Sequence, residues 1–218
     1  MTSPTERFSD RVDAYTRYRP GYPPEVIDRL TLEVGLGPGS VVADLGSGTG
    51  IWTELLLARG ASVFAVEPNA KMRAEAERRL DGRAGFTSVA GSAEETSLPS
   101  GSVELATAAQ AFHWFDRARA RREIARILRP DGVVALLWNT RRTTGDAFLE
   151  GYERLITDFS VDYPEVDHRS AERDIESFFG SPPGRASFPN HQELDYAGLE
   201  GRLSSTSYVV PPSHERWP

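Results

Sequence analysis

The strongest chemical signal in the sequence is a glycine-rich run, Val42-Ala43-Asp44-Leu45-Gly46-Ser47-Gly48-Thr49-Gly50, between an apolar stretch and a helical pattern. Glycines at such a junction permit a tight turn and let a ligand approach the backbone, where the amides of the following helix face it. The spacing is G-x-G-x-G, because Ile51 stands where a dinucleotide fingerprint needs its last glycine. Asp44 directly before the loop would also repel a pyrophosphate. Both features disfavour a nicotinamide dinucleotide.

An acidic residue follows the next apolar stretch. Glu67 lies 19 residues after Gly48, at the end of a second predicted strand. A carboxylate at this position can accept hydrogen bonds from both hydroxyls of a ribose. The loop and Glu67 together indicate an adenosine-type ligand without a pyrophosphate. The alternative is a strand-terminal acid that caps the helix starting at Asn69.

The elements that position these residues alternate in type along the chain. Short apolar runs predict buried strands at 41–45, 62–66, 85–90, 103–109 and 132–138. Helical spacing and capping residues predict helices at 23–34, 51–58, 70–80 and 116–128. This alternation predicts an α/β fold with a doubly wound, mostly parallel Rossmann-like sheet and helices on both faces. Ligands bind such sheets beyond the carboxyl ends of the strands.

The pattern changes after residue 139. Helices are predicted at 146–159 and 171–179, separated by the turn-rich stretch SVDYPEVDH, and RASFPNHQEL predicts a further strand. Pro211-Pro212-Ser213 is typical of a helix start, yet the chain stops five residues later. We therefore expect three parts: an N-terminal helical segment over 1–36, a Rossmann-like core over 37–140, and a C-terminal acceptor lobe over 141–218. That lobe is either unusual or incomplete.

Four motifs appear in order near the predicted strand ends: VADLGSGTG, VEPN, GSAEETSLP and AAQAFHWFD. They resemble the class I S-adenosylmethionine (SAM)-dependent methyltransferases. Within that family the chain is most similar to the small-molecule type that includes the trans-aconitate methyltransferases. The resemblance spans roughly residues 15–139. It implies SAM as cofactor and S-adenosylhomocysteine as product.

The resemblance also implies which residues contact the cofactor. Asp44 and the loop 46–50 surround the methionine moiety, Glu67 holds the ribose, and residues 92–94 frame the adenine. Many relatives carry aspartate where this chain has Ser92, so the contact to the adenine amino group would pass to Glu94. The expected cofactor-binding residues are Arg19, Asp44, Gly46, Ser47, Gly48, Thr49, Gly50, Glu67, Pro68, Ser92, Ala93, Glu94 and Gln110. Arg19 either pairs with the cofactor carboxylate or is a surface arginine.

The aromatic run that follows the fourth predicted strand lies where a methyl acceptor is expected. Aromatic faces stabilise a neighbouring sulfonium, and an imidazole titrates near neutral pH. We therefore expect His113 and Trp114 to be the catalytic residues. His113 is a general base, a contact residue or a structural residue, since a carboxylate acceptor needs no base. The alternative for the aromatic run is that Phe112 and Phe115 pack in the core while Trp114 lines a lid.

Composition excludes several other classes of function. The 218 residues contain no cysteine and carry a net charge of -7, and the four histidines show no metal-ligand spacing. We therefore expect no metal, no nucleic-acid partner and no membrane association. The expected protein is cytoplasmic and acts on a small molecule, and its oligomeric state is not predicted. A non-catalytic SAM- or adenosine-binding protein is the first alternative, and an NAD(P)-dependent oxidoreductase is the second.

Overall fold

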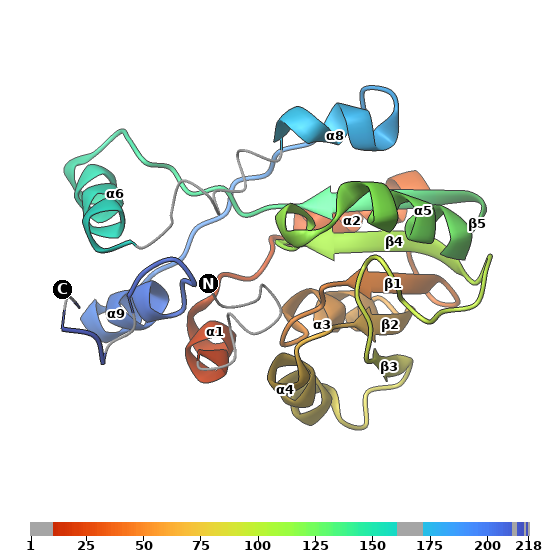
Figure 1. Ribbon diagram of the computed structural model, residues 1–218, viewed down its shortest axis with the longest axis horizontal. Helices are drawn as coiled ribbons and strands as arrows, with labels where there is room; N and C mark the ends of the chain where they lie inside the picture. The colour runs from red at the N-terminus through yellow and green to blue at the C-terminus, as the bar shows by residue number, and fades with distance from the viewer. Residues whose placement is uncertain (1–10, 161–171, 211–212, 216, 218) are drawn as a thin grey trace.

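Five strands form a parallel sheet in the computed structural model, which describes residues 11–160, 172–210, 213–215 and 217 (Figure 1). The strands are β1 (Val41–Leu45), β2 (Ser62–Val66), β3 (Phe86–Val89), β4 (Val103–Ala109) and β5 (Leu128–Leu137). Their order is β3-β2-β1-β4-β5, and every pairing is parallel. The order reverses between β1 and β4, so the carboxyl ends of these two strands form the switch point of the sheet. The doubly wound parallel fold is confirmed.

Helices cover both faces of the sheet because successive strand residues point to opposite sides. Val42 packs in a cluster with residues of α2 (Pro24–Val34) and α3 (Ile51–Ala58). Its neighbour Ala43 packs in a second cluster, with residues of α5 (Arg117–Ile127) and α8 (Glu172–Phe179). Both faces of β1 are therefore buried, which matches its continuous apolar sequence.

Local capping signals fix where several helices begin and end. Asn69 caps α4 (Ala70–Leu80), its side chain accepting from the amides of Lys71 and Met72. Asp116 caps α5 in the same way by accepting from the amide of Arg119. Gly35 ends α2 with a φ of 71°, a left-handed backbone that glycine adopts at little cost. The helix boundaries predicted at these residues are confirmed to within about one residue.

A third part of the molecule joins the N-terminal helix to the C-terminal segment. Helix α1 (Val12–Tyr18) packs against α9 (Tyr196–Ser204), and α6 (Ala147–Phe159) shares with α9 a small cluster of buried side chains. Gly201 permits the contact between α1 and α9, since a Cβ there would clash with the ring of Tyr18. Arg11 donates to the carbonyl oxygens of Thr206 and Val209, and Arg19 donates to that of Ser205.

The structure corrects two expectations. Residues 185–194 form no strand: Asn190 and Gln192 instead donate from their side chains to the carbonyl oxygens of Gly21 and Tyr18. Pro189 removes one of the amide donors that a ladder needs. Strand β5 begins at Leu128 rather than at residue 132. Leu128 pairs with Val103, and after a shift in register the regular pairing continues from Val133, which pairs with Leu105.

Some expectations lie outside the described residues or are not tested. The stretch 161–168 and the helix start at Pro211-Pro212 fall outside them. The division of the chain at residues 36 and 140 stays a prediction. Among the described helices, none has both the length and the apolar composition to cross a membrane.

Candidate active site

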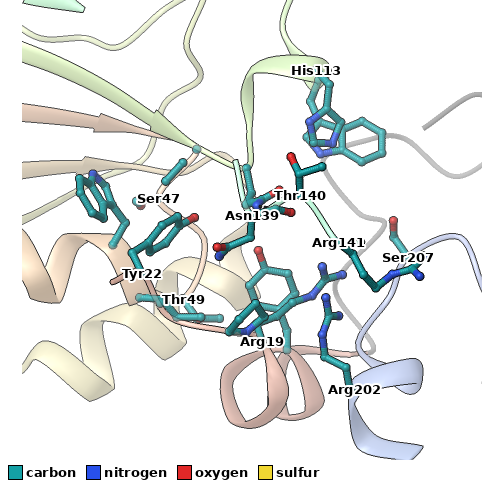
Figure 2. Close-up of a pocket in the computed structure, with 18 of the residues that line it drawn as sticks. Arg19, Tyr22, Ser47, Thr49, His113, Asn139, Thr140, Arg141, Arg202 and Ser207 are labelled. Carbon is teal, nitrogen blue, oxygen red and sulfur yellow. Dashed lines mark hydrogen bonds between the residues drawn. The ribbon is translucent and has the colours of Figure 1, made fainter. Parts of the chain in front are cut away.

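A pocket opens at the carboxyl ends of β1 and β4, where the sheet order reverses (Figure 2). Its lining comes from α1 and the segment after it, the end of β1 with the glycine loop and the start of α3, the end of β4, the loops after β4 and β5, and α9 with the residues that follow it. The lining residues are Tyr15, Arg19, Pro20, Tyr22, Asp44, Gly46, Ser47, Thr49, Ile51, Trp52, Ala109, Gln110, His113, Trp114, Asn139, Thr140, Arg141, Thr143, Arg202, Ser207 and Tyr208.

The glycine loop holds a backbone that side chains would disturb. Gly46, Gly48 and Gly50 all have positive φ, at 68°, 58° and 80°. A Cβ on Gly46 would lie 2.6 Å from the Cβ of Ala111, too close for two carbon atoms. The first glycine is therefore required both for its backbone conformation and for the close approach of the loop that follows β4.

Asp44 is completely buried at the end of β1, beside the loop. Its two carboxylate oxygens accept from the hydroxyls of Thr53, at 2.6 Å, and Thr107, at 3.3 Å. Burial raises the pKa of Asp44 to about 7, and the two hydroxyl donors act in the opposite direction. The carboxyl is thus held in one orientation at the wall of the pocket.

Glu67 ties the glycine loop to the start of α4. One of its carboxylate oxygens accepts from the amide of Gly48 at 2.9 Å, and the other accepts from the amide of Asn69 at 2.7 Å. Burial raises the pKa of Glu67 above its ordinary value, and these two amides oppose the shift. Each carboxylate oxygen still has a second lone pair with which it can accept from a ligand hydroxyl.

Polar atoms without a partner lie buried around the loop end of the pocket. Within the described part of the chain, Ser47 Oγ, Thr49 Oγ1 and Trp52 Nε1 make no hydrogen bond. All three residues line the pocket. Buried polar atoms in folded proteins are nearly always satisfied, so these three fit a ligand that brings its own polar groups.

His113 and Trp114 face the pocket from a short 3₁₀ helix, η1 (Phe112–Trp114), that follows β4. Phe112 anchors this turn because it is fully buried and its ring centroid lies 4.8 Å from that of Phe178. The rings of His113 and Trp114 lie 4.7 Å apart by their centroids. Phe112 and Phe115 pack in the core, and the anchored turn leaves the two catalytic candidates at the cavity.

Gln110 lies between β4 and η1 and is held from two sides. Its φ is 59°, an uncommon value for a residue other than glycine. Its amide donates to the carbonyl of Leu137 at 2.9 Å, and its side chain donates to the carbonyl of Asn139 at 3.3 Å. The side chain of Asn139 donates in turn to the carbonyl of Gly21. This network joins the ends of β4 and β5 to the segment that carries Arg19.

The side of the pocket formed by α9 and the loop after β5 is basic. Arg19, Arg141 and Arg202 line it, and Figure 2 draws all three on the side away from Ser47. Arg141 pairs with Glu153 and lies over the ring of Tyr152, 5.1 Å from its centroid. Burial and the neighbouring charge of Arg19 lower the pKa of Arg202 to about 10.

The structure brings part of the predicted set to this pocket. The predicted residues that line it are Arg19, Asp44, Gly46, Ser47, Thr49, Gln110, His113 and Trp114. The others lie outside its lining: Gly48, Gly50, Glu67, Pro68, Ser92, Ala93 and Glu94. Glu94 accepts from the amide of Asp116 at 2.8 Å, so its carboxylate caps the start of α5. The assignment of residues 92–94 to the adenine stays a prediction.

Sequence reasoning missed several further residues that line the pocket. Tyr22, Trp52, Arg141, Arg202 and Tyr208 line it although no motif marks them. Arg202 could be found only from the start of its helix, where Asp195 accepts from the amide of Gly198 as an N-cap. Among the described residues there is no group of three or more histidines, cysteines or acids that could hold a metal ion.

Comparison with known proteins supplies relatives for most of the chain. A family profile described as a methyltransferase domain matches residues 43–136. An uncharacterized methyltransferase-like protein of Schizosaccharomyces pombe is 33% identical over 215 residues, which are 96% of this chain and 81% of the relative.

Two further comparisons agree. An uncharacterized methyltransferase of Mycobacterium tuberculosis is 44% identical over 136 residues, 62% of this chain and 52% of the relative. The chain thus spans about half the length of the first curated relatives that it matches. A solved structure from Anaeromyxobacter dehalogenans, described as a "Putative Type II Methyltransferase", matches with a TM-score of 0.66 and 28% identity over 87% of this chain and 79% of that chain. These descriptions do not mention trans-aconitate, so that subtype stays a prediction.

Proposed function

Because the chain belongs to the class I SAM-dependent methyltransferase family, we propose that it transfers a methyl group from SAM to a small-molecule acceptor by in-line displacement. The observation that carries this proposal is the pocket itself, which joins the glycine loop to His113 and Trp114 in one cavity. In-line transfer needs a donor and an acceptor aligned in a space that excludes water.

The residues at the loop end fit the cofactor. Ser47, Thr49 and Trp52 offer buried polar atoms to the methionine moiety, and Arg19 offers a guanidinium to its carboxylate. Glu67 keeps the loop in position and retains lone pairs for the ribose hydroxyls. When bound, SAM supplies an activated methyl group on a positively charged sulfur.

Other lining residues would stabilise the positive charge of the SAM sulfur and remove a proton from the acceptor. The rings of Tyr22 and Trp114 line the cavity and would attract a sulfonium through their negative faces. His113 accepts the proton of an acceptor that must lose one, with its imidazole directed by the anchored turn of η1. An acceptor that is already ionised needs His113 only as a contact.

The class of acceptor and the location of the protein are proposed from the sequence. The net charge of -7 disfavours a nucleic-acid acceptor, so a small molecule is the proposal. Location in the cytoplasm stays a prediction from the sequence alone. A protein that binds SAM without transferring its methyl group remains the second candidate, whereas family membership removes the oxidoreductase alternative.

Isothermal titration with S-adenosylhomocysteine and with NAD tests the binding half of the proposal. We expect S-adenosylhomocysteine to bind and NAD to give no heat. Turnover of labelled SAM against a panel of metabolites tests the transfer half. Binding without turnover would favour the non-catalytic candidate, and binding of NAD alone would refute the proposal.

A further inference from the structure

The end of the pocket opposite the glycine loop gathers positive charge from three parts of the chain. Arg19 follows α1, Arg141 follows β5, and Arg202 lies in α9. In Figure 2 these three residues lie toward α9, with Ser47 and Tyr22 on the other side of the cavity. The pocket therefore has a loop end and an arginine end.

The three arginines differ in their partners. Arg141 is neutralised by Glu153. Among the described residues, Arg19 and Arg202 have no carboxylate partner: Arg19 donates to the carbonyl of Ser205 at 2.9 Å, and Arg202 approaches only the hydroxyl of Ser205, at 3.4 Å. Both side chains are partly buried, and a charge that is partly withdrawn from water without a counter-charge is costly, so such a pair favours a bound anion.

The surroundings of Arg202 offer further donors. Burial and the charge of Arg19 lower the pKa of Arg202 to about 10, so its guanidinium remains protonated at neutral pH. The phenols of Tyr152 and Tyr208 are close enough to influence it. Within the described residues the buried hydroxyl of Tyr152 has no hydrogen-bond partner. Of the two tyrosines, Tyr208 lines the pocket with Arg202, so a guanidinium and a phenol are both available to an oxyanion, which accepts from both.

One anion is already accounted for by the proposed cofactor. SAM carries a single carboxylate, and the proposed function assigns Arg19 to it. Arg202 also lines the pocket and, among the described residues, is left without a counter-charge. A second anionic group must therefore come from the other ligand of the pocket.

We propose that Arg202 binds an anionic group of the methyl acceptor, so that the acceptor is a small organic anion bearing a carboxylate or a phosphate. This inference rests on the proposed function, because it assigns the second ligand of the same pocket. Arg202 recognises the acceptor, while His113 and Trp114 face the reacting end.

The test is anion binding to the protein saturated with S-adenosylhomocysteine. Succinate, citrate and inorganic phosphate are titrated at low ionic strength, with succinamide as the neutral match for succinate. We expect at least one of the three anions to bind and succinamide to give no heat. The carboxylate and phosphate titrations distinguish the two kinds of anionic group.

Arg202→Met removes the charge and keeps the apolar stem. We expect it to weaken anion binding tenfold or more while changing the affinity for S-adenosylhomocysteine less than twofold. Arg185→Met, an exposed arginine outside the pocket lining, is the matched control and should change neither. Should Arg202→Met fail to fold, Arg202→Lys and Arg202→Gln replace it, with anion binding expected for lysine and lost for glutamine.

Three results overturn the inference. Absence of anion binding to the wild-type complex does so, as does unchanged anion binding in Arg202→Met. A parallel loss of S-adenosylhomocysteine affinity assigns Arg202 to the cofactor instead. If S-adenosylhomocysteine fails to bind the wild-type protein, the proposed function fails first, before any anion is added.

Discussion

The two ends of the pocket are built in different ways. The loop end comes from one continuous run, residues 42–50, supported by Glu67 and packed between the two large clusters of the sheet. The arginine end combines residues far apart in sequence, Arg19, Arg141 and Arg202. Among the described residues, α6 and α9 at this end share a cluster of four buried apolar side chains. Local backbone geometry thus determines the loop end, whereas long-range packing determines the arginine end.

The largest expected effect is at the loop end. Gly46→Ala introduces a Cβ at 2.6 Å from that of Ala111 and forces an alanine to a φ of 68°. We expect it to lower the free energy of unfolding by about 2–5 kcal/mol and to abolish S-adenosylhomocysteine binding. Urea unfolding and calorimetry measure the two effects.

The matched control for this change is Gly82→Ala. Gly82 has a similar φ of 70°, but a Cβ there would meet nothing within 4 Å. Gly82→Ala should therefore lower the free energy of unfolding by only about 1 kcal/mol and leave the affinity for S-adenosylhomocysteine unchanged. Equal losses in the two variants would contradict the role assigned to the close contact with Ala111.

His113→Gln tests the centre of the pocket, where the two ends meet. If His113 is the base, kcat should fall about 100-fold with S-adenosylhomocysteine affinity unchanged. Turnover measured as a function of pH tests this, because the fall in wild-type activity at acidic pH should be absent from His113→Gln. A loss below about tenfold with the acid limb intact would leave His113 as a contact residue and favour an acceptor that is already ionised.

Glu67→Ala separates two roles of one carboxylate at the loop end. It removes the acceptor for the amides of Gly48 and Asn69 and, by our proposal, for the ribose. We expect the affinity for S-adenosylhomocysteine to fall by about 2 kcal/mol. The 2′-deoxy analogue of S-adenosylhomocysteine distinguishes the two roles. The wild type should bind S-adenosylhomocysteine more tightly than this analogue, and Glu67→Ala should bind both alike. An equal preference in both proteins would restrict Glu67 to holding the loop.

The smallest expected effect is at the arginine end. Gly201→Ala drives a Cβ into the ring of Tyr18, which can move aside at some cost. We expect a loss of stability of about 1 kcal/mol, a several-fold weaker binding of the anion, and unchanged S-adenosylhomocysteine affinity. Gly151→Ala in α6 is the control. Its new Cβ meets nothing within 4 Å, so the stability of the protein should be unchanged or slightly higher. A loss of cofactor affinity in Gly201→Ala would show that the two ends are not independent.

The same difference explains what could be predicted from the sequence. The bounds of β1, β2 and β4 follow from short apolar runs, and α4 follows from its asparagine cap, because these signals are local. Helix α9 was not predicted because Gly198 and Gly201 lower its intrinsic helix propensity. Its position depends on Tyr18 and Arg11, more than 180 residues away in the chain.

The same reasoning applies to the site. Asp44, Gly46 and Ser47 could be placed at the pocket because they belong to one motif at one strand end. Arg202 carries no such mark, since a single arginine on a weakly patterned helix is usually exposed to solvent. Its position in the pocket follows only from how α9 packs against α1.

The hydrogen bonds from Arg11 to the carbonyl oxygens of Thr206 and Val209 span 195 and 198 residues of chain. Helix α1 has no fully buried residue of its own, so it depends on these distant partners. A nascent chain can pair all five strands once residue 137 is available, but α1 must wait for α9 and residues 206–209 before it can dock. The order of synthesis therefore completes the loop end of the pocket before the arginine end.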